Sequence, residues 1–190
     1  MKKVFLLLIA LSFHATAAAQ QTSQCPMPAD LSYSYVELRL IDVDVSGGDG
    51  FSIGGSYELD GPWIVIGSLT SLDFNNSVDS TTIEIGGGYV WDYSPNFDLV
   101  GTFSLVRNEF DTPIASSDDT GFALSGGARG YIAHRVEIRG SVNHINLDNS
   151  DTFLRVAGDY HFNEQIAAGL SLDLAGDTDS ISLGARWFFN

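Results

Sequence analysis

The sequence predicts an all-β fold, a closed antiparallel up-and-down transmembrane β-barrel of about ten strands, with eight as the alternative count. Three observations support this prediction. From residue 31 to the end of the chain, apolar and polar residues alternate with a period of two in runs of roughly ten residues. The charged residues inside these runs share one face. The connections between the runs alternate between short turns and acidic loops, as they do in barrels of this kind.

The first nineteen residues have the parts of a secretory signal peptide. A basic start at Met1-Lys2-Lys3 precedes a short apolar run, and small residues follow up to Ala17-Ala18-Ala19. The apolar run of about ten residues is too short for a helix to cross roughly 30 Å of hydrocarbon. We therefore expect residues 1–19 to be removed as a signal peptide, residues 20–30 to form a flexible periplasmic leader, and residues 31–190 to form the barrel.

The charge of the mature chain restricts its partners. Cleavage would remove both lysines and leave seven arginines against 24 acidic residues, a formal charge of −17. Such a chain has no general affinity for nucleic acid, which Lys and Arg bind by neutralising phosphates, and it is a poor candidate for attachment to anionic lipid. Cys25 is the only cysteine, so no disulfide can form within the chain. Because no Leu-rich lipoprotein box precedes Cys25, we interpret it as a free thiol rather than a lipid anchor.

The strands are predicted from the alternation. In the clearest run, Ile83 and Ile85 lie on one face, and Thr82 and Glu84 lie on the other. Tyr131 breaks the parity expected for its strand, which predicts a β-bulge there. The ten predicted strands cover residues 31–44, 50–59, 63–72, 80–91, 96–107, 119–131, 135–145, 152–162, 165–175 and 179–189.

The connections differ in character. Aromatic residues such as Tyr57 and Tyr89 precede the short turns, as expected where rings meet a lipid interface. The short connections are expected at residues 60–62, 92–95, 133–134 and 163–164. The acidic and mostly longer connections are expected at residues 46–49, 72–79, 108–119, 146–151 and 176–179. An even number of strands places both termini on the short-turn side, and we expect the acidic loops to face away from the cell.

Twelve charged residues are predicted to face a narrow lumen, where they pair and stabilise the barrel without catalysing a reaction. An unpaired charge there would cost several kcal/mol, and the opposite face, nearly free of charge, is favoured in lipid. The arginines of this set are Arg39, Arg129, Arg139, Arg155 and Arg186. The acids are Glu37, Glu58, Glu84, Asp98, Glu137, Asp159 and Asp173. Since the acids outnumber the arginines by two, we expect at least one carboxylate to be protonated or held by water.

The end of the chain carries a further signal. Apolar residues alternate through the last predicted strand, at Ile181, Leu183, Ala185, Trp187 and Phe189. This pattern resembles the terminal signal that outer-membrane barrels present to their assembly machinery, except that Asn190 follows the last aromatic residue here.

Three motifs together resemble the small outer-membrane β-barrel families, the OmpX- and OmpA-barrel-like proteins, and most closely the xanthomonad-type short barrels. They are Leu31-Ser32-Tyr33-Ser34-Tyr35-Val36-Glu37 at the start of the barrel, Gly87-Gly88-Tyr89 before a turn, and Ala185-Arg186-Trp187-Phe188 at its close. The resemblance covers residues 31–189. It implies a location in the outer membrane of a Gram-negative cell and no settled enzymatic activity.

The sequence predicts no catalytic, cofactor-binding or metal site. His134 lies in a short turn, and His161 lies on the polar face. His144 is placed for lipid A chemistry, but the serine of the His-x-Ser arrangement of deacylase barrels is replaced in His144-Ile145-Asn146. Close acid pairs such as Asp42 and Asp44 would suit Ca²⁺ or Mg²⁺, but a solvated acidic rim is the preferred interpretation.

These observations favour a protein without enzymatic activity that has a structural, envelope-integrity or surface-interaction role. A small selective channel is the alternative, although small barrels fill with side chains. A lipid A-modifying enzyme is the weaker alternative. The expected partners are outer-membrane lipids and lipopolysaccharide, and the barrel-assembly machinery during biogenesis. The barrel is expected to be a monomer.

Overall fold

The computed structural model describes residues 31–43, 47–74, 78–175 and 179–189 of the 190-residue chain. The expected signal peptide and leader, with Cys25, lie outside these described residues. No helix in the described part of the chain is long and apolar enough to cross a membrane.

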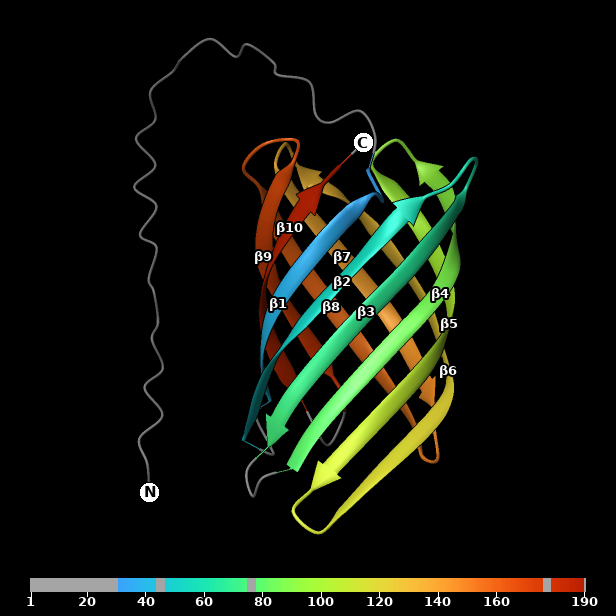
Figure 1. The fold of residues 1–190 in the computed structure, drawn as a ribbon. Coiled ribbons are helices and arrows are strands. Elements are labelled where there is room, and N and C mark those ends of the chain that lie inside the picture. The colour runs from blue at the N-terminus through green and yellow to red at the C-terminus, as the bar shows by residue number, and fades with distance from the viewer. Residues whose placement is uncertain (1–30, 44–46, 75–77, 176–178, 190) are drawn as a thin grey trace, which may run out of the picture.

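Ten antiparallel strands close into one barrel (Figure 1). Consecutive strands pair along the chain, and β1 pairs with β10 from Tyr35 opposite Phe188 to Val43 opposite Ser180, which closes the sheet. The strands are β1 (Tyr35–Val43), β2 (Gly48–Glu58), β3 (Trp63–Phe74), β4 (Val78–Ser94), β5 (Phe97–Thr112), β6 (Ala115–Ala133), β7 (Val136–Asn146), β8 (Ser150–His161), β9 (Ile166–Leu174) and β10 (Ser180–Phe188). The predicted fold class is confirmed, with ten strands rather than eight.

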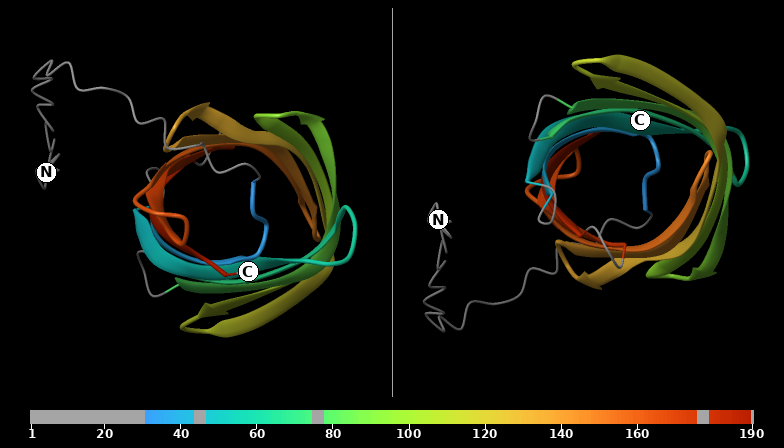
Figure 2. Two further views of the ribbon diagram at one scale, coloured as in Figure 1. Left: turned by 90° about the horizontal axis from the view of Figure 1, so that it is seen from above. Right: turned by 90° about the horizontal axis from the view of Figure 1, so that it is seen from below.

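The two ends of the barrel differ in chemistry more than in loop length. We call the end where β1 begins and β10 ends the terminal end, and we call the opposite end the acidic end. The two views along the barrel axis show the closed ring of strands (Figure 2). The terminal-end connections are residues 59–62, 95–96, 134–135 and 162–165, and the acidic-end connections are residues 44–47, 75–77, 113–114, 147–149 and 175–179. The expected difference in loop length is wrong, because each of these connections has five residues or fewer.

The sequence predicts a long acidic loop at residues 108–119, and this prediction is wrong. The strands β5 and β6 instead continue to Thr112 and from Ala115, and their hairpin extends past the neighbouring strands (Figure 1). Thr112 Oγ1 accepts a hydrogen bond from the Ala115 amide at 3.1 Å and donates one to the Ala115 carbonyl oxygen at 2.6 Å. Asp and Ser are depleted in strands, so composition alone favours a loop. The backbone ladder between the two strands overrides that preference.

The predicted bulge near Tyr131 is confirmed. The register of β6 against β7 shifts between Tyr131 and Ala133, which leaves Ile132 as an extra residue. Tyr131 keeps the lumen parity of Arg129 and is buried, whereas Ile132 is exposed on the outward face. The bulge therefore changes the register of β6 only beyond Tyr131.

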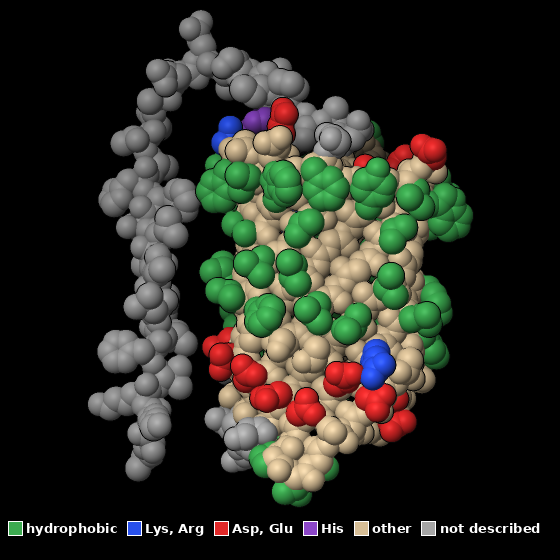
Figure 3. All heavy atoms as spheres, in the orientation of Figure 1, with side chains coloured by type: hydrophobic (Ala, Val, Ile, Leu, Met, Phe, Trp, Pro, Cys, Tyr) green, Lys and Arg blue, Asp and Glu red, His purple; other side chains and the backbone are tan. Residues whose placement is uncertain are grey.

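The two faces of the wall are sharply different. On β5, Phe103 is 52% exposed on the outward face, whereas its neighbour Ser104 is 1% exposed in the lumen. Ile85 and Leu170, also predicted to face lipid, are exposed as well. Figure 3 shows hydrophobic side chains over the middle of the barrel and a row of acidic side chains toward the acidic end. A broad outward apolar band of this kind is unfavourable in water and favoured in lipid.

Aromatic side chains form a belt on the outward face at the terminal end. Trp63 and Tyr89 meet edge to face with ring centroids 5.1 Å apart, and Tyr57 stacks near Phe189 at 6.4 Å. These rings precede or follow the turns, as the sequence predicts. Rings with polar atoms favour the boundary between hydrocarbon and headgroups, so the belt marks one edge of the membrane-spanning zone.

Gly61 and Gly86 show two different reasons why the backbone requires glycine. Gly61 has a φ of 83° in the turn between β2 and β3, a conformation that other residues rarely adopt. Gly86 faces the lumen, where a Cβ atom would lie 2.2 Å from the carbonyl oxygen of Phe103. The curvature of the wall at β4 and β5 therefore leaves no room for a side chain at Gly86.

Phe103→Arg is expected to impair folding into bilayers far more than Thr102→Arg. An arginine on the lipid-facing side near the membrane centre costs roughly 2–4 kcal/mol, whereas Thr102 lines a polar cavity in the lumen. The measurement is the free energy of unfolding of each variant in lipid vesicles. Equal losses in the two variants would contradict this assignment of faces, and a larger loss in Thr102→Arg would show that the faces are exchanged, because a shift of one residue inverts a strand.

Candidate functional site

The twelve charged residues predicted to face the lumen all occupy lumen-facing positions in their strands. Nine of them take part in ion pairs: Glu37, Arg39, Arg129, Glu137, Arg139, Arg155, Asp159, Asp173 and Arg186. The other three carboxylates accept hydrogen bonds from neutral groups, namely Glu58 and Asp98 from Tyr33 and Glu84 from Ser104.

Arg186 lies at the centre of the largest group of ion pairs. Its Nη1 is 3.0 Å from Glu137 Oε1, its Nε is 3.4 Å from Glu37 Oε1, and its Nη2 is 3.7 Å from Asp159 Oδ2. Arg186 and Glu137 are 2% and 0% exposed. Three carboxylates from three different strands therefore meet one guanidinium, whose planar fork can serve several acceptors at once.

Three further arginines complete this group, which we call the terminal cluster. Arg129 binds Glu137 through two nitrogens, at 2.8 and 3.0 Å. Arg139 Nη2 lies 2.9 Å from Asp159 Oδ2, and Arg39 Nη2 lies 2.5 Å from Glu37 Oε2. Four arginines thus face three carboxylates in the cluster, a local excess of positive charge inside an acidic protein.

Residues 31–34, which precede β1, fold into the terminal end of the lumen. The Tyr33 amide donates to Glu58 Oε1 at 2.8 Å, its hydroxyl donates to Asp98 Oδ2 at 3.0 Å, and Arg129 Nη1 donates to the Ser32 carbonyl at 2.8 Å. Burial raises the pKa of the Tyr33 hydroxyl, so the group stays protonated and able to donate. The ring packs on Ile64 and Val90 in the small apolar core of the barrel.

Aromatic rings and a histidine fill the space around the terminal cluster. The guanidinium carbon of Arg129 lies 4.6 Å from the Tyr33 ring centroid, and that of Arg186 lies 4.6 Å from the Tyr35 ring centroid. His161 Nε2 is 3.0 Å from Glu137 Oε2, and its ring stacks on Phe188 at 5.3 Å. Side chains therefore occupy the lumen at the terminal end, where they are nearly inaccessible to solvent.

Sequence reasoning did not assign these aromatic and histidine side chains to the network. Tyr35, His161 and Phe188 share the lumen parity of Glu37, Asp159 and Arg186 in their own strands. Parity could therefore have found them. Tyr33 lies before the first strand, so the alternation of the sequence carried no signal for it.

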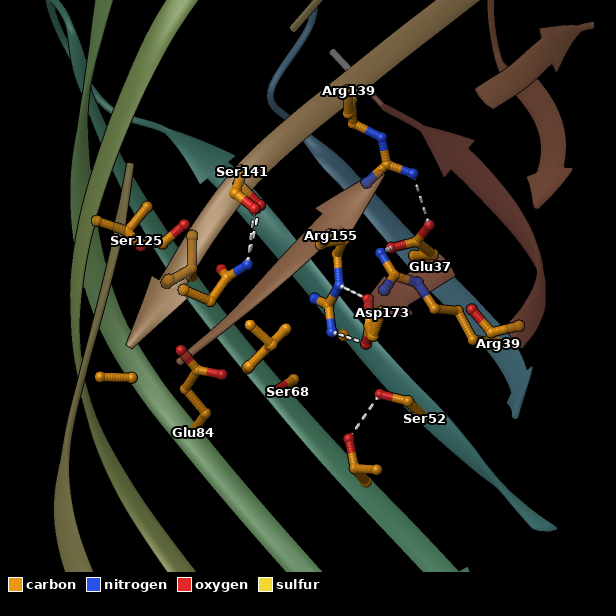
Figure 4. A pocket seen from close by; sticks show the side chains of 18 of the residues that line it. Glu37, Arg39, Ser52, Ser68, Glu84, Ser125, Arg139, Ser141, Arg155 and Asp173 are labelled. Carbon is orange, nitrogen blue, oxygen red and sulfur yellow. Dashed lines mark hydrogen bonds and ion pairs between the residues drawn. The ribbon is translucent and has the colours of Figure 1, made fainter. Parts of the chain in front are cut away.

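Beyond the terminal cluster, a cavity of about 560 Å³ runs through the lumen toward the acidic end. Figure 4 shows its polar side chains, which come from most of the strands. Arg155 binds Asp173 through two nitrogens, both at 2.6 Å. Glu84, on the facing wall, accepts a hydrogen bond from Ser104. Side chains fill the lumen at the terminal end, and the cavity occupies the lumen beyond it.

The acidic end carries a row of aspartates on its outward face, which we call the aspartate ladder. Asp42 lies opposite Asp49, Asp49 opposite Asp73, Asp73 opposite Asp79, and Asp79 opposite Asp111. All five are exposed. Directly opposed side chains have Cβ atoms about 4.5–5.5 Å apart, and like charges in such pairs are destabilising. The row continues the belt of acidic side chains below the apolar band (Figure 3).

Asp, Glu and His side chains are the candidate metal ligands among the described residues, and His144 is the candidate for catalysis. The described residues contain no group of three or more His, Cys, Asp or Glu arranged to hold a metal ion. His144 Nδ1 lies 2.8 Å from Thr152 Oγ1 on the neighbouring strand. Within the described part of the chain, no carboxylate contacts His144, so no third group orients the ring for nucleophilic catalysis.

The comparisons with known proteins agree with this geometry. The model of the family described as "Outer membrane protein beta-barrel domain" matches residues 5–152. No curated protein matches the chain.

Several solved structures resemble this chain at low sequence identity. The KdgM porin superposes with a TM-score of 0.53 at 12% identity, covering 82% of this chain and 99% of its own. The NanC porin gives a TM-score of 0.53 at 10% identity, covering 81% and 100%. Ail, the attachment invasion locus protein of Yersinia pestis, gives 0.42 at 19% identity, covering 82% and 95%. At these identities the two porins are evidence for the fold alone.

Arg186→Met is expected to lower the free energy of unfolding by about 3–5 kcal/mol, because it leaves buried carboxylates without their shared partner. Arg107→Met is the control, since Arg107 pairs with Glu109 at 2.8 Å on the exposed outward face, where a pair contributes about 0–1 kcal/mol. Urea titrations of both variants in lipid vesicles measure the difference. Similar unfolding midpoints would contradict a stabilising role for the terminal cluster.

Asp73→Asn is expected to raise the free energy of unfolding by about 1 kcal/mol at low ionic strength, because it removes two opposed like-charge pairs. The gain should shrink in 1 M NaCl, where the Debye length is about 3 Å. Asp60→Asn, in a terminal-end turn outside the ladder, serves as the control. A gain that is independent of salt, or equal at Asp60, would rule out electrostatic repulsion along the ladder.

Proposed function

Because the chain belongs to the outer membrane protein beta-barrel domain family, we propose that this outer-membrane barrel has a structural or surface-interaction role in the envelope, without conducting solutes or catalysing a reaction. The observation that carries the proposal is the closed terminal end of the lumen. There Arg186 and Glu137 are almost fully buried. Tyr33 packs against Arg129, and Phe188 packs against Arg186. A solute would have to displace paired charges and rings together.

The outward surface supports the membrane partners in this proposal. The apolar band contacts outer-membrane lipid, and the aspartate ladder lies beside it at the acidic end, which we place on the cell exterior. There the ladder faces the headgroups of lipopolysaccharide, whose phosphates share its negative charge. Divalent cations in the surrounding medium would screen the negative charge of both the ladder and the phosphates. The barrel-assembly machinery is the proposed partner during insertion, and the inserted barrel acts as a monomer.

A small selective channel is the second candidate, and the cavity of about 560 Å³ is the observation that favours it. Among the described residues, the terminal cluster, the rings and histidine around it, and residues 31–34 separate that cavity from the terminal end. A rearrangement of these groups would connect the two sides of the barrel. The likeness to the KdgM and NanC porins extends to the fold and brings no substrate with it.

Planar-bilayer conductance separates the two candidates. The wild-type barrel is expected to give no conductance steps above background. Arg129→Ser/Glu137→Ser removes both partners of a buried pair at the terminal end and is expected to open the lumen and produce steps. The matched control is Arg107→Ser/Glu109→Ser, which removes a pair of the same length on the outward face. Steps in the wild-type protein would favour the channel.

A further inference from the structure

The lumen cavity has two chemically different zones. Its floor, next to the terminal cluster, is lined by charged and hydroxyl side chains, including Arg155, Asp173 and Glu84 (Figure 4). Its other part, toward the acidic end, is lined in large part by apolar side chains near the ends of four strands. We call these residues the apolar collar: Ile41, Val43, Leu72, Phe74, Ile145 and Phe153.

On three of the four strands the lumen positions change from polar to apolar toward the acidic end, as they do from Arg39 to Ile41 on β1. On β8 Phe153 lies between Arg155 and Asp151, and Asp151 lines the same cavity. The collar faces the lumen, so lipid cannot cover it. Apolar surface left in water costs about 25 cal/mol per Å². An apolar group inside the collar would remove that surface from water.

The floor disfavours an anionic group. Its guanidiniums already have carboxylate partners, with Arg155 bound twice to Asp173 and Arg39 bound to Glu37. An added anion would have to break such a pair or remain without one. In contrast, the hydroxyls of Ser68, Thr82 and Ser125 line the cavity. Hydroxyls can both donate and accept, so they match a ligand rich in hydroxyl groups.

We propose that the lumen cavity binds a small amphiphile with a hydroxyl-rich head that carries no negative charge, the head resting on the polar floor and the apolar part lying in the collar. The volume of about 560 Å³ falls within the roughly 300–1,000 Å³ of ligand pockets. The lining reaches Val43 and Phe74, the last residues of β1 and β3 at the acidic end. The ligand therefore enters from that end. This site goes beyond the proposed function, since a non-conducting barrel needs no ligand.

Methyl NMR of the isoleucine-labelled barrel in nanodiscs tests the proposal, with n-hexyl β-D-glucoside as the probe. The inward methyl groups of Ile41 and Ile145 should shift saturably on titration. The outward methyl groups of Ile85 and Ile138 report partition of the probe into lipid and should shift without saturation. Glucose alone and hexanol alone should each bind about tenfold or more weakly, because each lacks one half of the contacts.

Two substitutions identify the site. Phe153→Ala removes a ring from the collar and should weaken binding about tenfold, whereas Leu154→Ala, the outward-facing neighbour, should leave it unchanged. Thr82→Val keeps the shape of the side chain and removes a floor hydroxyl, so it should weaken binding of the glucoside more than binding of hexanol. It also tests the proposal if Phe153→Ala fails to fold.

Inward methyl shifts that follow the outward ones without saturation would overturn the proposal, as would equal affinities for the glucoside and hexanol. Neither result bears on the conductance measurement. The failure of the ligand site is therefore distinguishable from the failure of the proposed function.

Discussion

Closure of the sheet between β1 and β10 is the constraint on which the rest of this structure depends. In hydrocarbon every backbone N–H and C=O group needs a partner within the protein, and a closed barrel supplies all of them. Closure also separates two environments along each strand, because successive side chains point to opposite faces. Once the outward face is committed to lipid, every charge in the middle of a strand must be accommodated in a narrow lumen.

The two ends of the lumen meet that requirement differently. At the terminal end, arginines and carboxylates from four strands converge on Arg186 and Glu137, and aromatic rings exclude water from around them. Toward the acidic end, Arg155 and Asp173 form a separate pair beside a cavity. Paired charges in the first region and open space in the second give a barrel that is closed at one end and hollow at the other.

The aspartate ladder opposes the stability of the fold. It places five like charges in direct opposition across five neighbouring strands, although cross-strand pairs normally stabilise a sheet through complementary side chains. Salt and cations near the membrane surface weaken this repulsion. The ladder therefore couples the stability of the barrel to the ionic conditions at its acidic end, whereas the buried terminal cluster is shielded from them.

The sequence by itself determined the alternation, the parity of the twelve lumen charges, the bulge near Tyr131 and the family resemblance, because each depends on residues close together in the chain. Tertiary structure decided which charges meet: Arg186 contacts Glu37, 149 residues away. It also decided the β5–β6 hairpin, the insertion of Tyr33 and the aspartate ladder. The physical reason is register, since the hydrogen-bonded ladder between neighbouring strands fixes which side chains lie level, and no single strand encodes that alignment.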